Sequence, residues 1–187
     1  MRKYNFLLVM LVAILAISCS QSSSDTQVSN LGTKWHWDKG TIVIETPERP
    51  TGQTSVIGLK APKMEFVRIG FVGLGMRGPA AVERFTYIPG VEIVALCDYE
   101  KERAEECQEL LKKASMPEAT VYSGEKGYEE LCKRDDIDLV YIATDWLHHF
   151  PVAMCAMENG KHTAIEVPSA MSLKECWALI DMSEKTR

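Results

Sequence analysis

Three glycines, spaced as Gly73-x-Gly75-x-x-Gly78, form the pattern in this chain that points most directly to chemistry. They follow an apolar run, residues 67–72, that has the composition of a buried strand. In such a turn the first glycine permits a tight bend and the second lets the backbone approach a pyrophosphate, while the third lets the next helix pack closely. The ligand's charge then lies at a helix N-terminus. The spacing therefore predicts a dinucleotide-binding turn.

An acidic residue stands where a dinucleotide's ribose would need one. The apolar run 91–98 ends in Asp98, which lies 20 residues beyond Gly78. At this distance dinucleotide-binding domains place a carboxylate that accepts hydrogen bonds from the adenosine ribose hydroxyls. Because a carboxylate there repels a 2′-phosphate, we expect NAD as the cofactor rather than NADP. The alternative is that Asp98 is only a solvated carboxylate at a strand end.

The elements that must position these residues follow a regular alternation from residue 65 onward. Apolar runs of strand length alternate with amphipathic runs of helical length, which predicts an α/β fold with a doubly wound parallel sheet. We expect a Rossmann NAD-binding domain over 65–187, with its strands in the order 3-2-1-4-5. The expected strands are 67–72, 91–97, 120–122, 137–143 and 163–166. The expected helices are 79–85, 101–113, 128–133, 151–158 and 173 to the end. The last helical pattern reaches Arg187 without a terminating glycine or proline, so we expect a truncated protein that lacks a C-terminal substrate domain.

The first residues have the pattern of an export signal. Arg2 and Lys3 precede an apolar run, 6–17, of only 12 residues, which is too short to span a bilayer as a helix. Ala16-Ile17-Ser18-Cys19 resembles a bacterial lipobox. We therefore expect a lipoprotein signal peptide over 1–18, lipid on Cys19, and an exported protein anchored to a membrane of the cell envelope. Ordinary signal cleavage, which leaves Cys19 free, is the alternative. Residues 19–64 are then expected to form a tether and an irregular arm.

Charge and cysteine usage exclude several classes of function. Without its first 18 residues the chain has 19 basic against 26 acidic residues, a formal charge near −7. No Lys/Arg cluster interleaves with aromatic residues, so no nucleic-acid partner is expected. The other cysteines are odd in number and widely spaced, so neither a disulfide framework nor a metal site is expected. They are Cys97, Cys107, Cys132, Cys155 and Cys176. The oligomeric state stays open, and a homo-oligomer is compatible with the sequence.

Two later segments resemble the glucose-fructose oxidoreductase/inositol dehydrogenase (Gfo/Idh/MocA) family. Ala143-Thr144-Asp145-Trp146-Leu147-His148-His149 follows the fourth predicted strand, and Glu166-Val167-Pro168 follows Asn159-Gly160-Lys161-His162. Family members typically carry Thr-Pro-Asn-x-x-His, then Gly-Lys-His, then Glu-Lys-Pro. The resemblance covers residues 67–187. Val167 stands where dehydrogenase members carry a lysine that assists proton transfer, which argues against simple alcohol dehydrogenation because valine cannot move a proton.

One branch, glycoside hydrolase family 109, resembles the chain more closely. Its members share the Gly-Met-Arg-Gly turn, the Asp-Trp-Leu-His-His segment, Glu-Val-Pro, and parts of the arm from Arg49-Pro50 to Pro62-Lys63. The resemblance implies an NAD-dependent α-N-acetylgalactosaminidase that hydrolyses glycans with terminal N-acetylgalactosamine through transient C3 oxidation, elimination and addition of water. An NAD-dependent sugar or polyol dehydrogenase and a non-catalytic NAD-binding lipoprotein remain alternatives.

The same resemblance implies the cofactor contacts. It places Met76 and Arg77 at the turn, Asp98 at the ribose, Trp146, Leu147, His148 and His149 beside the nicotinamide half, and Glu166 and Val167 along the next strand end. We hypothesise that His149, or with less support His148, orients the sugar or relays a proton, because imidazole titrates near neutrality. Each assignment has a plainer alternative: a solvated Arg77, Trp146 as cover for the sheet edge, a helix-capping histidine, or Glu166 as a mere strand end. We assign no catalytic residue within this chain.

Overall fold

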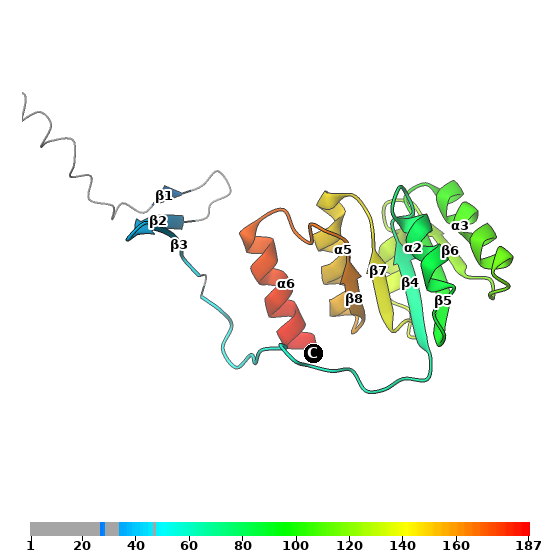
Figure 1. Cartoon of the computed structure of the whole chain (residues 1–187), viewed down its shortest axis with the longest axis horizontal. Helices are drawn as coiled ribbons and strands as arrows, with labels where there is room; N and C mark the ends of the chain where they lie inside the picture. Colours follow the sequence, from blue (N-terminus) through cyan, green and yellow to red (C-terminus); the bar gives the residue numbers. More distant parts are fainter. Residues whose placement is uncertain (1–26, 29–33, 47) are drawn as a thin grey trace, which may run out of the picture. The chain divides into compact units, whose positions relative to one another are not determined.

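The computed structural model describes residues 27–28, 34–46 and 48–187, and the chain forms two units, residues 1–47 and Glu48–Arg187 (Figure 1). The predicted signal peptide, 1–18, and the predicted lipidation site, Cys19, lie outside the described residues. Within the described part, no helix has both the length and the apolar character needed to cross a membrane.

The first unit contains a small antiparallel sheet. Its strands are β1 (Gln27–Val28), β2 (Lys34–Asp38) and β3 (Thr41–Ile44), in the order β1-β2-β3. A two-residue turn joins β2 to β3, with positive φ at Lys39 and Gly40, which suits the right-handed twist of a hairpin. The arm is thus less irregular than expected, because this turn and the alternating tryptophans of β2 favour a hairpin.

The second unit is the predicted doubly wound domain. Its five parallel strands lie in the order β6-β5-β4-β7-β8, which is the predicted 3-2-1-4-5 order. The strands are β4 (Val67–Val72), β5 (Val91–Asp98), β6 (Thr120–Ser123), β7 (Leu139–Ile142) and β8 (His162–Ile165). The helices are α2 (Gly78–Phe85), α3 (Lys101–Lys113), α4 (Gly127–Cys132), α5 (Trp146–Glu158) and α6 (Leu173–Thr186).

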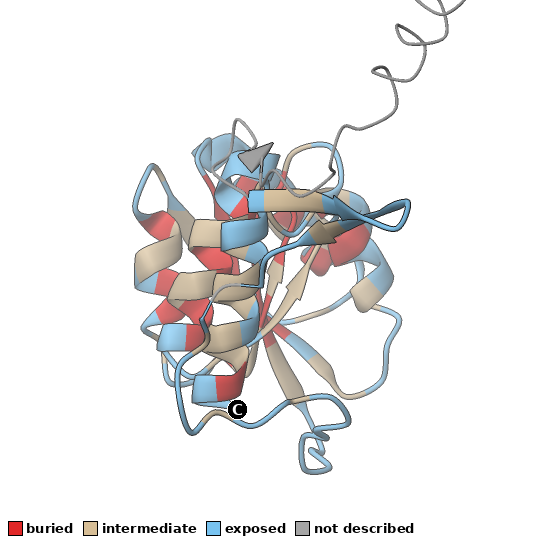
Figure 2. Ribbon diagram, turned by 90° about the vertical axis from the view of Figure 1, so that its left-hand side faces the viewer, coloured by how far each residue is buried: buried red, intermediate tan, exposed pale blue. Residues whose placement is uncertain are grey.

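Apolar side chains cover both faces of the parallel sheet. One core cluster joins Ile69 and Phe71 to residues of α2 and α3, and a second joins Val72 and Val140 to residues of α4 and α5. Neighbouring residues of β4 enter opposite clusters because side chains alternate along a strand. Figure 2 shows buried residues on the helices as well as on the strands of this domain. With both faces covered, the strand ends are left to form a binding site.

Helix α5 begins five residues earlier than the sequence predicts. The expected start was at Pro151, but Asp145 caps the helix and accepts a hydrogen bond from the Leu147 N–H at 2.9 Å, so the first residue is Trp146 and Pro151 lies inside. Residues 146–149, which the predicted elements leave between a strand and a helix, therefore form the first turn of α5. This correction fixes where the side chains of 146–149 point.

Helix α6 begins as predicted, with a capping box. Ser172 accepts from the Glu175 N–H at 3.2 Å, and the Glu175 carboxylate accepts from the Ser172 N–H at 3.1 Å. The segment before β4 is joined to this helix by Arg49, whose Nη2 lies 2.7 Å from Asp181 Oδ1 and 2.8 Å from Glu184 Oε2. Residues 48–53 are therefore attached to the domain.

Candidate NAD-binding site

The turn after β4 requires two of its three glycines for its own packing. Gly73 has φ +91°, and a Cβ there would overlap the backbone of Ala143 and Thr144. A Cβ at Gly78 would overlap the carbonyl oxygen of Gly73, because α2 packs directly against the turn. The packing of the fold therefore explains why glycine is required at positions 73 and 78, without any ligand.

The middle glycine is different, because none of the residues that the structure describes comes close enough to require it. A Cβ at Gly75 would meet only Arg103 Nη1, at 3.6 Å, which is ordinary van der Waals contact. The space that Gly75 leaves open therefore faces outward, where a ligand can reach the backbone. Such close approach is the role of the second glycine in pyrophosphate-binding turns, so the turn fits a dinucleotide.

Asp98 is tied into the protein more tightly than expected. Its side chain is 7% exposed. Oδ2 accepts from the Leu74 N–H at 2.6 Å, while Oδ1 accepts from the Glu100 N–H at 3.0 Å and lies 3.5 Å from Arg103 Nη1. A carboxylate has about four acceptor positions, so capacity remains for one ribose hydroxyl. Asp98 therefore holds the glycine turn against β5 as well as standing at the ribose position.

A groove of about 670 Å³ lies at the carboxyl ends of β4, β7 and β8. It brings together most of the predicted site residues from four separate segments. Those lining it are Gly73, Gly75, Met76, Arg77, Asp98, Trp146, Leu147, His149, Glu166 and Val167. Gly78 lies behind the turn in the packed start of α2, and His148 lines a neighbouring cavity.

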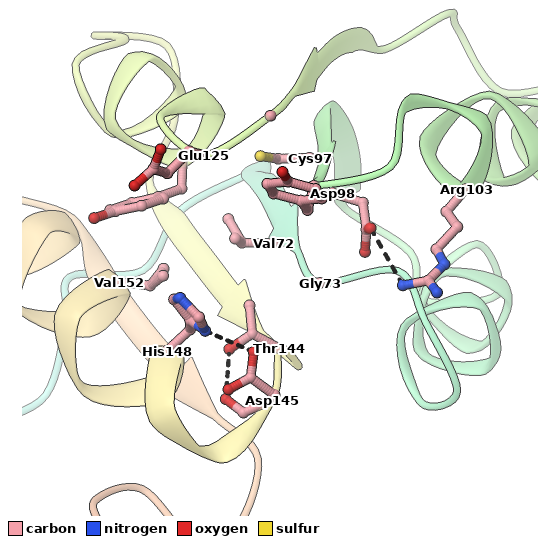
Figure 3. A pocket seen from close by; sticks show the side chains of 13 residues that line it. Val72, Gly73, Cys97, Asp98, Arg103, Glu125, Thr144, Asp145, His148 and Val152 are labelled. Carbon is pink, nitrogen blue, oxygen red and sulfur yellow. Dashed lines mark hydrogen bonds and ion pairs between the residues drawn. The ribbon is translucent and has the colours of Figure 1, made fainter.

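That neighbouring cavity measures about 420 Å³ and extends the groove toward β5 and β6. The two share Gly73, Asp98, Arg103, Thr144 and Asp145. Figure 3 shows Asp98 and Arg103 on one side of this cavity and His148 with Asp145 on the other. Together the cavities make one elongated site across the point where the strand order reverses, which is where doubly wound sheets bind dinucleotides.

The structure separates the roles of the two histidines. His149 is 1% exposed, and its ring nitrogens lie 2.7 Å from the Pro168 carbonyl oxygen and 3.1 Å from the Thr144 carbonyl oxygen. Both ring nitrogens are thus engaged by backbone, and His149 joins α5 to the chain segments after β7 and β8. This geometry does not favour His149 as a proton relay to a sugar. It favours the plainer structural role.

His148 is the accessible member of the pair. Its side chain is 60% exposed, and its Nδ1 lies 2.6 Å from Asp145 Oδ2. Burial of the Asp145 carboxyl acts to raise its pKa, but hydrogen bonds from His148 and from the Leu147 N–H outweigh burial and lower the pKa. Asp145, which replaces the usual proline of the family pattern, therefore both caps α5 and holds the His148 ring.

At the far end of the groove, Glu166 and Val167 follow β8. Glu166 Oε1 accepts from the Tyr141 hydroxyl at 2.7 Å. Burial, together with this bond to Glu166, raises the pKa of Tyr141. Val167 is 80% exposed and lines the groove. An apolar side chain therefore stands in the open at the position where the family pattern carries a lysine.

Arg103 is the main groove residue that the motifs did not predict. It lies in the first turn of α3, beside Asp98 and the open side of Gly75, and it lines both cavities. A guanidinium beside a glycine turn suits a phosphate ligand. The sequence does not single it out, because Lys101 is a basic residue of the same helical turn and lines neither cavity.

Comparisons with known proteins agree with this geometry. Residues 67–187 match a family model described as "Oxidoreductase family, NAD-binding Rossmann fold". The chain belongs to the Gfo/Idh/MocA oxidoreductase family. Its second unit is therefore an NAD-binding domain, and the prediction of NAD as cofactor is confirmed.

Among curated proteins, the chain is 69% identical over its whole length to glycosyl hydrolase family 109 protein 5 of Phocaeicola vulgatus, of which it covers 36%. It is 64% identical to glycosyl hydrolase family 109 protein 1 of Bacteroides fragilis, over 77% of this chain and 32% of that protein. The predicted resemblance to family 109 is thus confirmed. The chain spans about a third of the length of these relatives.

Solved structures of this family share the fold. The myo-inositol dehydrogenase of Lactobacillus casei, in complex with NAD(H) and myo-inositol, is 27% identical with a TM-score of 0.55, over 63% of this chain and 33% of that one. The UDP-N-acetylglucosamine 3-dehydrogenase of Acidithiobacillus ferrooxidans is 27% identical with a TM-score of 0.53, over 66% of this chain and 35% of that one.

Proposed function

We propose that this chain is the cofactor-binding part of an NAD-dependent glycosidase that removes terminal α-N-acetylgalactosamine from glycans. The observation that carries the proposal is whole-chain identity of 63–69% to three Phocaeicola vulgatus proteins named as members of glycosyl hydrolase family 109. Membership in an NAD-binding oxidoreductase family agrees with it, because NAD-dependent glycosidases do not use the usual pair of carboxylates.

The far end of the groove also supports this function. Val167 is exposed there and cannot exchange a proton. Glu166 is hydrogen-bonded to Tyr141, which positions its carboxylate at the strand end. In the proposed enzyme, groups outside this chain perform the acid-base steps on the sugar. The contribution of the chain is to fix the cofactor's orientation toward the sugar carbon that is oxidised.

The chemistry that bound NAD supplies is reversible acceptance of a hydride from C3 of the sugar, which acidifies the C2 proton and permits loss of the aglycone and addition of water. The residues of this chain bind the cofactor and orient it toward the sugar. The turn at Gly75 admits the pyrophosphate, Arg77 and Arg103 provide positive charge, and Asp98 receives a ribose hydroxyl. Because no NAD is consumed over a complete cycle, the proposed reaction needs no external supply of cofactor.

The test is to incubate the full-length protein with an aryl α-N-acetylgalactosaminide in D₂O. The proposal predicts release of the aglycone and deuterium at C2 of the sugar product, because the C2 proton is lost to solvent and replaced from it. Aglycone release without deuterium at C2 would contradict the elimination mechanism.

A sugar or polyol dehydrogenase is the second candidate, because the similar solved structures at 27% identity include two dehydrogenases. The two functions differ in the fate of NAD. A dehydrogenase produces one NADH for each free sugar oxidised and releases no aglycone, whereas the glycosidase releases aglycone without net NADH. A protein that binds NAD and does neither is the non-catalytic alternative.

We also propose that the protein is an exported bacterial lipoprotein anchored through Cys19. The support is the lipobox-like sequence at residues 16–19, which follows a short apolar run. Metabolic labelling with a fatty-acid analogue tests this. Label in the wild type that is absent from a Cys19→Ser variant is the expected result, and equal labelling of both would contradict it.

A further inference from the structure

The cavity of Figure 3 has the position of the adenosine half of the cofactor. Asp98, the ribose-binding carboxylate of this fold, lies where the two cavities join. One cavity runs from it toward Glu166 and Val167, beside the first turn of α5. The other runs toward Tyr99 and Tyr128, whose aromatic rings suit the face of a purine. A base attached to a ribose at Asp98 would therefore extend into the second cavity. His148 would then lie on the adenosine side, and not beside the nicotinamide half, where the family resemblance places it.

Asp145 and His148 form a hydrogen-bonded pair at the wall of this second cavity. The distance from His148 Nδ1 to Asp145 Oδ2 is 2.6 Å. An ionised carboxylate can only accept, so Nδ1 carries the proton and donates it. In the neutral imidazole, Nε2 then holds a lone pair and is an acceptor. Figure 3 shows one ring nitrogen turned toward Asp145 and the other turned away from it.

Three features of Asp145 keep this arrangement in place. Its Oδ1 accepts from the Leu147 N–H at 2.9 Å, so the carboxylate is fixed to the helix start. The adjacent hydrogen bonds lower its pKa, which keeps it ionised near neutrality. His148 lies one turn along α5, on the same side of the helix as its cap. The orientation of the His148 ring is therefore set by the fold rather than by the ligand.

We propose that the Asp145–His148 pair determines base specificity, with Nε2 of His148 accepting a hydrogen bond from the exocyclic amine of adenine. Hypoxanthine carries a carbonyl oxygen at the same position, and two acceptors facing each other are unfavourable. The site consequently distinguishes NAD from nicotinamide hypoxanthine dinucleotide. This proposal concerns the cofactor and does not depend on which sugar the full protein acts on.

Among the other acceptors that line the cavity, one exposed carboxylate is the competitor that the test must separate from His148. Glu125, an exposed carboxylate after β6, also lines the wall. Arg103 is a donor and does not recognise an amine. A Glu125→Gln variant therefore reports whether the carboxylate, rather than the imidazole, receives the amine.

The experiment measures the Kd of the full chain for NAD and for nicotinamide hypoxanthine dinucleotide at pH 8.5. The expected ratio of the two Kd values in the wild type is at least about tenfold in favour of NAD, the size of one well-made hydrogen bond. His148→Leu keeps bulk but removes the acceptor, and we expect the ratio to fall to about one to two. Asp145→Ser keeps a helix cap but frees the ring, so the ratio falls as well.

Two controls complete the test. His162, exposed at the start of β8, lines neither cavity, and His162→Leu leaves the ratio unchanged. Circular dichroism and NAD binding itself show that each variant is folded. A wild-type ratio near one overturns the proposal. So does a ratio that survives in His148→Leu, or one that collapses in Glu125→Gln instead.

Discussion

The glycine turn after β4 and the first turn of α5 face each other across the groove, and they are specified in different ways. In the turn, backbone geometry decides: Gly73 has positive φ, and side-chain atoms on Gly73 or Gly78 would overlap main-chain atoms. In α5, adjacent histidines have unlike surroundings, with His149 buried between two carbonyl oxygens and His148 exposed beside Asp145. One side of the groove is fixed by sterics, the other by hydrogen-bond partners.

A sequence motif can therefore reveal the glycines of the site more readily than its histidines. A glycine's requirement is local, because φ and close backbone approach follow from the strand-turn-helix connection itself. The role of a histidine depends on its partners, and the Pro168 carbonyl that engages His149 lies 19 residues away in sequence. Variants on the two sides of the groove test this distinction.

Gly73→Ala should have the largest effect. The added Cβ overlaps the backbone of Ala143 and Thr144 at a φ that alanine disfavours, so we expect the free energy of unfolding to fall by more than about 3 kcal/mol, with loss of NAD binding. The control is Gly160→Ala, where φ is +71° but the space around the Cβ is open, and the expected loss is about 1 kcal/mol. Denaturant unfolding compares the two, and equal losses would contradict the steric account.

The paired histidines provide the next effect. His149→Ala removes two contacts to backbone carbonyls and leaves a cavity at a buried side chain, which should lower the free energy of unfolding by about 2–4 kcal/mol. His148→Ala should lower it by less than about 0.5 kcal/mol, because the side chain is largely exposed. Thermal or denaturant unfolding measures both. A stable His149→Ala protein would remove the structural role assigned to this residue.

Gly75→Ala should separate ligand binding from stability. The new methyl group meets only Arg103, so we expect the free energy of unfolding to change by less than about 0.5 kcal/mol. The same methyl group occupies the approach to the pyrophosphate, and NAD affinity should fall at least about tenfold, as measured by titration calorimetry. Unchanged NAD affinity in a folded Gly75→Ala protein would place the phosphates elsewhere.

The smallest effect is expected at the other ends of the same strands, where Asp138 accepts from Arg68 Nη2 at 2.6 Å and from Arg68 Nε at 3.0 Å. The hydrogen bond from Arg68, set against burial, lowers the pKa of Asp138. A lowered carboxyl pKa stabilises the fold above the ordinary value of about 3.9 and loses that contribution as pH falls below it. Asp138→Asn should therefore flatten the acid side of the stability profile while leaving NAD affinity unchanged. A change in NAD affinity would show that the two strand ends are coupled.

Much of the domain could be predicted from the sequence because its signals are repeated and local. Five apolar runs separated by amphipathic stretches predicted the strand order, and the last helical pattern predicted the start of α6 at residue 173. The start of α5 was wrong because Pro151 is a stronger local signal than the cap at Asp145. Strand β2 was missed because its tryptophans and histidine also fit an irregular segment.

The groove residues also differ in this way: local sequence signals predict some of them, and the others come together only in the fold. The glycines, Asp98 and the strand-end residues Glu166 and Val167 could be placed by their position after a strand. The pairing of Asp145 with His148 could not be predicted, because it depends on α5 beginning at Trp146. Arg103 was overlooked for a similar reason, since its proximity to Asp98 and Gly75 appears only when α3 folds back over the turn.

We propose that the groove between Asp98 and Val167 holds NAD as a cofactor that is regenerated in each turnover. The most direct measurement gives the full-length protein one equivalent of bound NAD, an excess of an aryl α-N-acetylgalactosaminide and no free cofactor, and counts aglycone and NADH together. The account predicts many aglycones released for each NAD, with no accumulation of NADH. Release that stops at one aglycone for each NAD, with stoichiometric NADH, would contradict it.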